Sequence, residues 1–211
     1  MSPAPFYVFE GADGVGKSTQ VGLLARHLEA RGANVLVVRE PGATALGEQV
    51  RRILLDPESG EIDPATEMFL FMAARAHLTA RRIVPALEAG RTVICDRYLW
   101  STAVYQGIVG GVGVDEVMRA GRVAGVRRPT RTFLIDVPPA VAAGRRAPEE
   151  RSDRMESRGR RFQEQVRRGF LALARRYPRE AAVIDGRGAP EEVHRRILDR
   201  LPRPAGRAGK G

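Results

Sequence analysis

The chain contains five short runs of apolar residues, separated by longer stretches in which apolar residues recur every three or four positions. Short continuous runs are typical of strands buried in a parallel sheet, and the intervening period is that of amphipathic helices. The predicted strands are Phe6–Phe9, Val35–Val38, Thr92–Cys95, Thr132–Ile135 and Ala182–Ile184. Because strands alternate with helices, the pattern predicts an α/β fold, a five-stranded parallel sheet covered by helices on both faces.

The connection between the second and third predicted strands is long and runs from Glu40 to Gly90. It contains a predicted helix near Leu46–Leu54, a break rich in Pro, Gly and Asp at Asp56–Pro64, and a long predicted helix near Thr66–Ala89. Helices inserted there form a wall over the carboxyl ends of the strands, where ligands bind in sheets of this kind.

The segment after the first predicted strand has the spacing G-x-x-x-x-G-K-[ST] of a phosphate-binding loop. Its glycines let backbone N–H groups surround an anion, Lys17 is expected to reach the β- and γ-phosphates, and the Ser18 hydroxyl to bind Mg²⁺. Because a strand precedes the loop and a helical pattern follows it, the sequence predicts a nucleoside-triphosphate site. The residues expected to bind ATP are Gly11, Ala12, Asp13, Gly14, Val15, Gly16, Lys17, Ser18 and Thr19.

Two predicted strands are followed directly by an aspartate, the usual position of the carboxylate that organises the metal in this kind of fold. The sequence reads VICD at residues 93–96 and FLID at residues 133–136. Arg97 distinguishes the first, because a guanidinium beside a phosphate loop can hold a second phosphate through two hydrogen bonds. Asp96 is therefore the predicted metal-organising residue, and Asp136 is interpreted as a strand-end or helix-capping residue.

Three further side chains are candidates for binding a substrate. Arg39 follows the second predicted strand at a turn, where it could bind a phosphate or pair with a neighbouring acid. Phe71 and Arg75 are four residues apart and share a helix face, so the ring could stack on a base while the guanidinium bonds its edge. The alternative is core packing for Phe71 and a surface charge for Arg75, and spacing alone favours that alternative.

Taken in order, these motifs resemble those of the thymidylate kinase family. The matching motifs are the phosphate loop with Asp13 at its third position, Arg39-Glu40-Pro41-Gly42, Phe71-x-x-x-Arg75, and Asp96-Arg97-Tyr98 followed by Ser101 and Tyr105-Gln106. Asp153-Arg154-Met155-Glu156 resembles the lid signature of the family. The similarity extends from about Phe6 to Leu201, nearly the whole chain.

The resemblance implies the fold of the P-loop nucleoside-monophosphate kinases, a three-layer sandwich with a mobile, arginine-rich lid. It implies transfer of the γ-phosphoryl group of ATP to dTMP, with Mg²⁺, in dTTP biosynthesis, by a homodimer. Asp96 would organise the metal together with Ser18. In the substrate site, Asp13 would hold the sugar 3′-hydroxyl, Arg39 and Arg97 the phosphate, and Tyr105 would lie under the sugar. Thymine would stack on Phe71 and accept a hydrogen bond from Arg75 at O4, in a pocket also lined by Ser101 and Gln106.

Three features differ from the family pattern, and the first is Met155, which stands where relatives often carry an aromatic or branched residue. Residues 13–15 lack the arginine that some members carry in the phosphate loop, so the transition-state charge is expected to be met by the lid at about residues 145–158. This places the chain with a lid-arginine, bacterial-type subgroup, in which Arg146, Arg151 and Arg154 join Lys17, Asp96 and Arg97 as the predicted catalytic residues. Ala43 stands where the family often has a glycine, which costs stability only if its φ is positive.

Composition changes this picture little. The net charge of +10 suggests anionic partners, but six of the ten excess charges fall within residues 143–161 and 202–211, so no broad nucleic-acid-binding face is expected. One cysteine excludes an internal disulfide, and no apolar run is long enough to span a membrane. We therefore expect a cytoplasmic enzyme without nucleic-acid or membrane partners, with one domain over residues 1–201 and a disordered basic tail at 202–211.

Two other functions remain open from the residues. The nearest is a kinase for another nucleoside monophosphate or for a deoxynucleoside, which would differ in the base edge that faces Arg75. The second is a nucleotide switch or a nucleic-acid-associated protein, which the net positive charge favours. Against the second, the chain has no Asn-Lys-x-Asp guanine motif and no zinc-like cysteine spacing.

Overall fold

The structure is a computed structural model of the whole chain, and it describes residues 4–145 and 159–202. The predicted lid arginines Arg146, Arg151 and Arg154, and all of the predicted tail except Pro202, lie outside the described residues.

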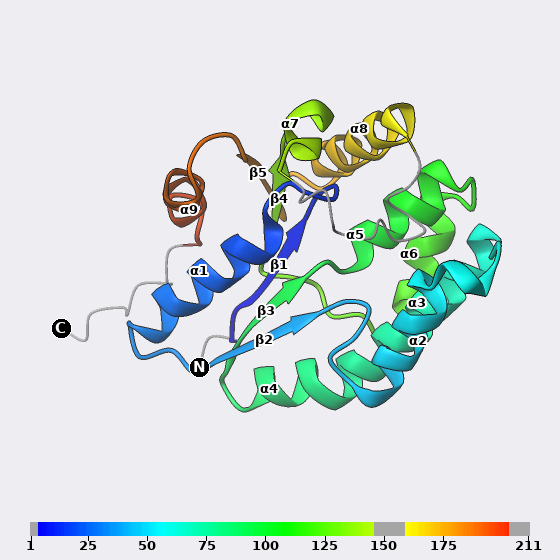
Figure 1. Cartoon of the computed structure of the whole chain (residues 1–211). Coiled ribbons are helices and arrows are strands. Elements are labelled where there is room, and N and C mark those ends of the chain that lie inside the picture. Colours follow the sequence, from blue (N-terminus) through cyan, green and yellow to red (C-terminus); the bar gives the residue numbers. More distant parts are fainter. Residues whose placement is uncertain (1–3, 146–158, 203–211) are drawn as a thin grey trace.

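A five-stranded parallel sheet with the strand order β2-β3-β1-β4-β5 forms the centre of the fold (Figure 1). The strands are β1 (Phe6–Glu10), β2 (Val35–Arg39), β3 (Thr92–Asp96), β4 (Arg131–Asp136) and β5 (Ala181–Asp185). All five predicted strands are confirmed, and each extends one residue further at its carboxyl end. The added residues are polar, so the chemically active side chains gather along one edge of the sheet, where ligands bind in this class of fold.

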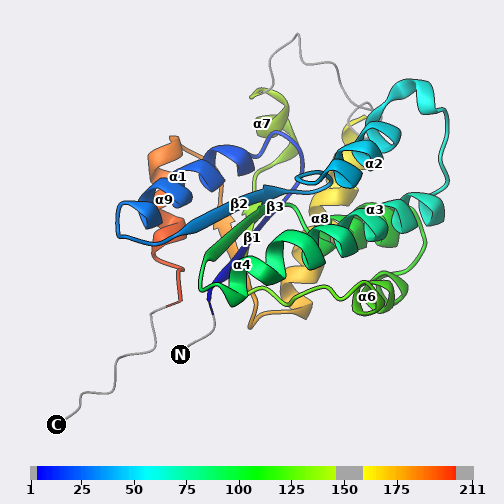
Figure 2. The ribbon, with the colours of Figure 1, turned by 90° about the horizontal axis from the view of Figure 1, so that it is seen from below.

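Helices cover both faces of the sheet, which confirms the predicted three-layer α/β sandwich (Figures 1 and 2). The helices α1 (Lys17–Glu29) and α9 (Pro190–Leu198) lie together on one side. The other helices are α2 (Ala45–Leu55), α3 (Pro64–Leu78), α4 (Val84–Glu88), α5 (Leu99–Thr102), α6 (Val114–Val123), α7 (Pro139–Ala143) and α8 (Arg160–Arg176). Within the described part of the chain, no helix is both long enough and apolar enough to cross a membrane.

The central strand β1 joins two apolar clusters, because successive strand residues point to opposite faces. Phe6 and Val8 belong to a cluster with Leu78 of α3, and Tyr7 and Phe9 belong to a second cluster that contains Phe133 of β4. The β1 side chains are buried throughout, and each large apolar side chain removed from water contributes about 1.5–3 kcal/mol. This packing fixes the position of the loop that follows β1.

The long connection between β2 and β3 has the predicted parts, with one difference. Its second helix is not uniform, since α3 continues into the π-helical stretch Thr79–Ile83 before α4. Pro85 lacks an N–H group and cannot bond the carbonyl four residues earlier, which accounts for altered hydrogen bonding there. The helix α3 begins after Asp63, whose carboxylate accepts hydrogen bonds from the N–H groups of Ala65 and Thr66.

Candidate active site

The loop between β1 and α1 borders a cavity of about 520 Å³, which we call the larger cavity. Gly14 and Gly16 have φ values of 75° and 95°, which glycine adopts without strain. The first residues of α1 also line this cavity, so the helix N-terminus favours an anion there. The predicted ATP-binding residues that line it are Asp13, Gly14, Val15, Gly16, Lys17, Ser18 and Thr19.

Gly11 and Ala12 are not among the residues that line the larger cavity. Gly11 has a φ of 140°, and a Cβ atom there would lie 2.6 Å from the carbonyl oxygen of Ile135, so glycine is needed for the loop to pass β4. The carbonyl oxygens of Gly11 and Ala12 accept hydrogen bonds from Lys17 Nζ at 3.1 and 2.7 Å. The carbonyl groups of these two residues therefore position the Lys17 side chain, although the residues themselves do not line the cavity.

Lys17 is almost completely buried at the base of the larger cavity. Burial, and after it the nearby Arg97 charge, lower the pKa of its ammonium group to about 8, while Asp13 and Asp96 oppose the shift. An anionic ligand would reverse this effect, because a phosphate beside the ammonium group favours its charged form.

The two predicted metal-binding side chains are hydrogen-bonded to each other. Ser18 Oγ donates to Asp96 Oδ2 at 2.7 Å, and both residues line the larger cavity. Among the described residues, no group of three or more His, Cys, Asp or Glu could hold a metal ion. Two oxygen ligands at a phosphate site nevertheless fit Mg²⁺, which completes its octahedral shell with phosphate oxygens and water.

Asp136, the second strand-end aspartate, lines neither of the two cavities of the site. Its two carboxylate oxygens accept hydrogen bonds from Arg167 of α8 at 2.7 and 2.8 Å. The interpretation of Asp136 as a structural strand-end residue is therefore confirmed, although Pro138, and not Asp136, is the N-cap of α7.

A second cavity of about 160 Å³, which we call the smaller cavity, adjoins the first. The structure brings together there the side chains predicted to bind the sugar and the base, from the phosphate loop, α3, α5 and the following π-helical stretch Ala103–Val109. They are Asp13, Phe71, Arg75, Ser101, Tyr105 and Gln106. Phe71 also packs against the apolar contact between α2 and α3, so its core-packing interpretation is confirmed in part, and its stacking on a base stays a prediction.

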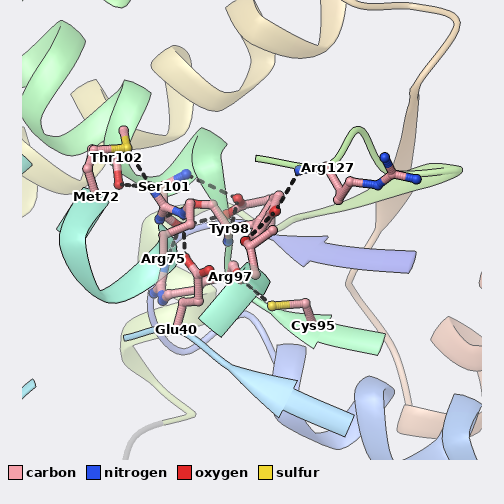
Figure 3. Close-up of polar contacts among 11 residues, drawn as sticks. Glu40, Met72, Arg75, Cys95, Arg97, Tyr98, Ser101, Thr102 and Arg127 are labelled. Carbon is pink, nitrogen blue, oxygen red and sulfur yellow. Dashed lines mark hydrogen bonds and ion pairs between the residues drawn. The ribbon is translucent and has the colours of Figure 1, made fainter. Parts of the chain in front are cut away.

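Arg75 is buried, and the alternative that it is a surface charge is wrong. Figure 3 shows its side chain among its polar partners Glu40, Tyr98 and Thr102. Its guanidinium donates from Nε to Glu40 at 2.5 Å, from Nη1 to Thr102 Oγ1 at 3.1 Å and from Nη2 to the carbonyl oxygen of Tyr98 at 3.0 Å. Burial raises the pKa of the Glu40 carboxyl, and the Arg75 charge opposes that shift. The fork of Arg75 is thus held in one orientation at the wall of the smaller cavity.

Arg97 and Asp13 lie at the junction of the two cavities and line both. Arg97 forms an ion pair with the Asp13 carboxylate and donates to the Gly11 carbonyl oxygen at 3.1 Å and to Ser101 Oγ at 3.0 Å. The hydroxyl of Tyr105 donates to the second carboxylate oxygen of Asp13 at 3.0 Å. Arg97 has a φ of 65°, and a non-glycine residue in this conformation is characteristic of functional sites.

A model of the thymidylate kinase family matches residues 9–197. The chain belongs to the thymidylate kinase family. A thymidylate kinase of Symbiobacterium thermophilum is 45% identical over 203 residues, 94% of each chain. One of Desulfosudis oleivorans is 42% identical over 206 residues, 94% of this chain and 96% of the relative.

The fold comparison agrees with the family model. The crystal structure of thymidylate kinase from Ehrlichia chaffeensis aligns with a TM-score of 0.77 and 32% identity, covering 93% of this chain and 97% of that chain. The chain is a kinase that uses ATP to phosphorylate dTMP in nucleotide biosynthesis.

Glu10 is a residue of this thymidylate kinase site that the sequence analysis missed. Its buried carboxylate accepts hydrogen bonds from the N–H groups of Tyr98 and Ser101 at 2.9 and 3.1 Å, and from Ser101 Oγ at 2.6 Å. It therefore caps α5 from the end of β1 and fixes the segment that carries Arg97. The available signal was an acid placed directly after an apolar strand.

Arg51, which was not predicted as a binding residue, and Arg145, which was predicted only as the start of the lid segment, also belong to the thymidylate kinase site. Arg51 of α2 lines both cavities and donates to the carbonyl oxygen of Pro41 at 3.2 Å. Arg145 donates to the carbonyl oxygens of Val15 at 3.3 Å and Gly186 at 2.9 Å, which joins the phosphate loop to the segment after β5. No local motif marks Arg51.

Arg39 lies at the larger cavity and not at the smaller one. Its exposed guanidinium pairs with Glu48 of α2 at 3.2 Å. The interpretation that Arg39 pairs with a neighbouring acid is confirmed, and its contact with the substrate phosphate stays a prediction.

Proposed function

We propose that the larger cavity binds the phosphates of ATP, that the smaller cavity binds dTMP, and that the phosphoryl group passes between them beside Arg97. The observation that carries this proposal is that the same residues line both cavities at their junction. These residues are Asp13, Glu40, Arg51 and Arg97. A phosphoryl transfer needs two anions brought in line across such a junction, with positive charge to offset their repulsion.

In the smaller cavity, thymine stacks on Phe71 and accepts a hydrogen bond at O4 from Arg75. Ser101 and Gln106 line the same space, and Asp13 holds the sugar 3′-hydroxyl above Tyr105. The arginine clamp on the dTMP phosphate consists of Arg97, Arg51 and, on the outer side, Arg39. The support for these roles is the common lining of the cavity and the fixed orientation of the Arg75 fork.

In the larger cavity, Lys17 and the backbone N–H groups of the loop bind the β- and γ-phosphates. The Ser18 hydroxyl and the Asp96 carboxylate are the residues that would hold Mg²⁺. When bound, Mg²⁺ supplies positive charge to the phosphate oxygens and orients them. Arg146, Arg151 and Arg154 supply the remaining charge from the lid, since the phosphate loop has no arginine of its own.

Base selectivity tests the placement of dTMP. Thymine presents an acceptor at position 4 and cytosine a donor, and Arg75 has only donors. We therefore expect ADP release with dCMP to fall by about 10³-fold or more in kcat/KM, and with dUMP by no more than roughly 10–200-fold. In Arg75→Lys, which keeps a charge beside Glu40 but loses the fork, the dTMP-to-dCMP ratio should shrink.

The exposed Arg81→Lys serves as the matched control, because it makes the same change on the same helical segment. If Arg75→Lys keeps the wild-type ratio, Arg75 does not contact the base. If dCMP or another monophosphate is the preferred acceptor of the wild-type enzyme, the smaller cavity does not bind thymine as proposed.

We also propose that the enzyme is a homodimer that packs through α2 and α3. Large apolar side chains are exposed on these neighbouring helices, including Phe69 with 65% and Ile53 with 47% of their surface accessible. Apolar side chains gathered on adjacent helices are typical of a surface that a partner covers.

A further inference from the structure

The amide of Gln106 is held by one end only. Gln106 is 1% exposed and lines the smaller cavity. Its Nε2 donates to Glu67 Oε2 at 2.8 Å, whereas its Oε1 is buried without a hydrogen-bond partner among the described residues. A buried acceptor of this kind is costly unless a ligand satisfies it.

Glu67 determines which end of that amide faces the ligand. An ionised carboxylate has only acceptor oxygens, so the NH₂ group of Gln106 must turn toward it. Glu67 is itself 2% exposed, but it lies in the first turn of α3, where the helix dipole favours a negative charge. The carbonyl oxygen Oε1 is therefore the end of the Gln106 amide that remains for a molecule in the cavity.

We propose that Glu67 is a positioning residue for base selectivity, which acts by fixing Gln106 Oε1 as an acceptor for the ring N3–H of the base. This rests on the proposed placement of thymine in the smaller cavity. Thymine and uracil carry a hydrogen on N3, and cytosine presents a lone pair there. Two facing acceptors repel, so the Glu67–Gln106 pair rejects cytosine at N3 independently of any contact at position 4.

The substitution Glu67→Gln tests this directly, because a glutamine at 67 can donate as well as accept. The amide of Gln106 is then free to turn, and its NH₂ group can face the base. We expect the dTMP-to-dCMP ratio of kcat/KM to fall by about 10-fold, the equivalent of one lost hydrogen bond. The exposed Glu61→Gln makes the same chemical change ahead of α3 and should leave the ratio unchanged.

The double variant Glu67→Gln/Gln106→Glu restores the arrangement with the partners exchanged. The amide at 67 then donates to the carboxylate at 106, whose second oxygen again faces the base as an acceptor. Selectivity should recover toward the wild-type ratio. This double variant keeps one carboxylate and one amide in the same place. It therefore still tests the proposal if Glu67→Gln alone unfolds, which a thermal melt would reveal.

A pH profile separates positioning from a merely structural role. The fluorine of 5-fluoro-dUMP withdraws electrons and makes N3–H more acidic than in dUMP, so at alkaline pH the ring loses this donor. The affinity of the wild-type enzyme for 5-fluoro-dUMP relative to dUMP should fall as pH rises, and the fall should be smaller in Glu67→Gln. Taking the ratio of two ligands cancels the titration of Lys17 and other groups of the protein.

An unchanged dTMP-to-dCMP ratio and an unchanged pH profile in a folded Glu67→Gln would overturn the proposal. The substitution Gln106→Ala distinguishes this failure from that of the site itself. If Gln106→Ala raises KM for dTMP while Glu67→Gln has no effect, thymine lies where we placed it but Glu67 does not position the amide. If Gln106→Ala has no effect on KM, thymine does not bind in the smaller cavity.

Discussion

At the scale of single residues, polar groups of the site are held by protein partners that a substrate would replace. Lys17 donates to two loop carbonyls, and Arg97 is paired with Asp13. Such pairs keep each side chain near its working position while satisfying it in the absence of a ligand. Burial and the nearby Arg97 charge lower the pKa of Lys17 to about 8, which is a measurable property of the site.

We expect ATP binding to be linked to protonation of Lys17. In the free enzyme the ammonium group is largely neutral at pH 9, because its pKa is about 8, whereas bound phosphates favour the charged form. ATP binding at pH 9 should therefore take up about one proton, and the affinity should fall as pH rises above 8. Calorimetry in buffers of different ionisation enthalpy measures this uptake. Uptake that persists in Lys17→Met would assign the proton to another group.

Ala43 has a backbone conformation that is unfavourable for alanine. The sequence alone did not determine whether its φ is positive. Its φ is 59°, so the condition under which alanine is unfavourable is met. The substitution Ala43→Gly should raise the free energy of unfolding by about 0.5–1 kcal/mol, after allowing for the greater freedom of glycine in the unfolded chain. The melting temperature should rise by about 1–4 °C. Ala30→Gly, at a φ of −61°, is the control and should lower it.

At the scale of secondary structure elements, the site is built from segments that end at the same edge of the sheet. Hydrophobic periodicity was enough to predict the five strands and the helices between β2 and β3, because burial on a regular sheet leaves a regular pattern. The π-helical stretch at Thr79–Ile83 was not predictable from that pattern, since apolar spacing does not report which carbonyl a given N–H group bonds.

At the scale of secondary structure elements, the prediction concerns the lid arginines. Arg145, the last described residue before them, bonds the phosphate loop at Val15, so the chain enters residues 146–158 beside the larger cavity. We expect alanine at Arg146, Arg151 or Arg154 to lower kcat, by about 10³–10⁵ for a residue that contacts the transferred phosphoryl group, with little change in KM for dTMP. Arg160→Ala, on the exposed start of α8, is the control. A kcat close to wild type in all three variants would refute the role.

Sequence motifs predicted more residues of the site than hydrophobic periodicity did. They predicted only those residues that belong to a short local motif. Phe71, Arg75, Ser101 and Gln106 were predicted and line one cavity. The partners that orient them were not predicted. Glu67 lies 39 residues from Gln106 in the sequence, and Glu10 lies 91 residues from Ser101. Pairings across such distances depend on how the elements pack, and a single sequence carries no local sign of them.

At the scale of the whole molecule, the proposed homodimer rests on the exposed apolar side chains of α2 and α3. The two helices lie side by side at the edge of the molecule, away from α1 and α9 (Figure 2). We expect the wild-type enzyme to be a dimer by light scattering, and Phe69→Glu to be largely monomeric. Val123→Glu places the same charge at an exposed apolar residue of α6 and should remain a dimer. A monomeric wild-type enzyme would contradict this surface as an interface.

The division of the two cavities between the two nucleotides is tested most directly by a crystal structure with a bisubstrate analogue, in which adenosine and thymidine are joined by a chain of phosphates. We expect thymine between Phe71 and Arg75 in the smaller cavity, the phosphates across Arg97, and adenosine beyond the phosphate loop toward Arg145. Thymidine bound outside the smaller cavity, with Phe71 and Arg75 making no contact with it, would contradict the assignment.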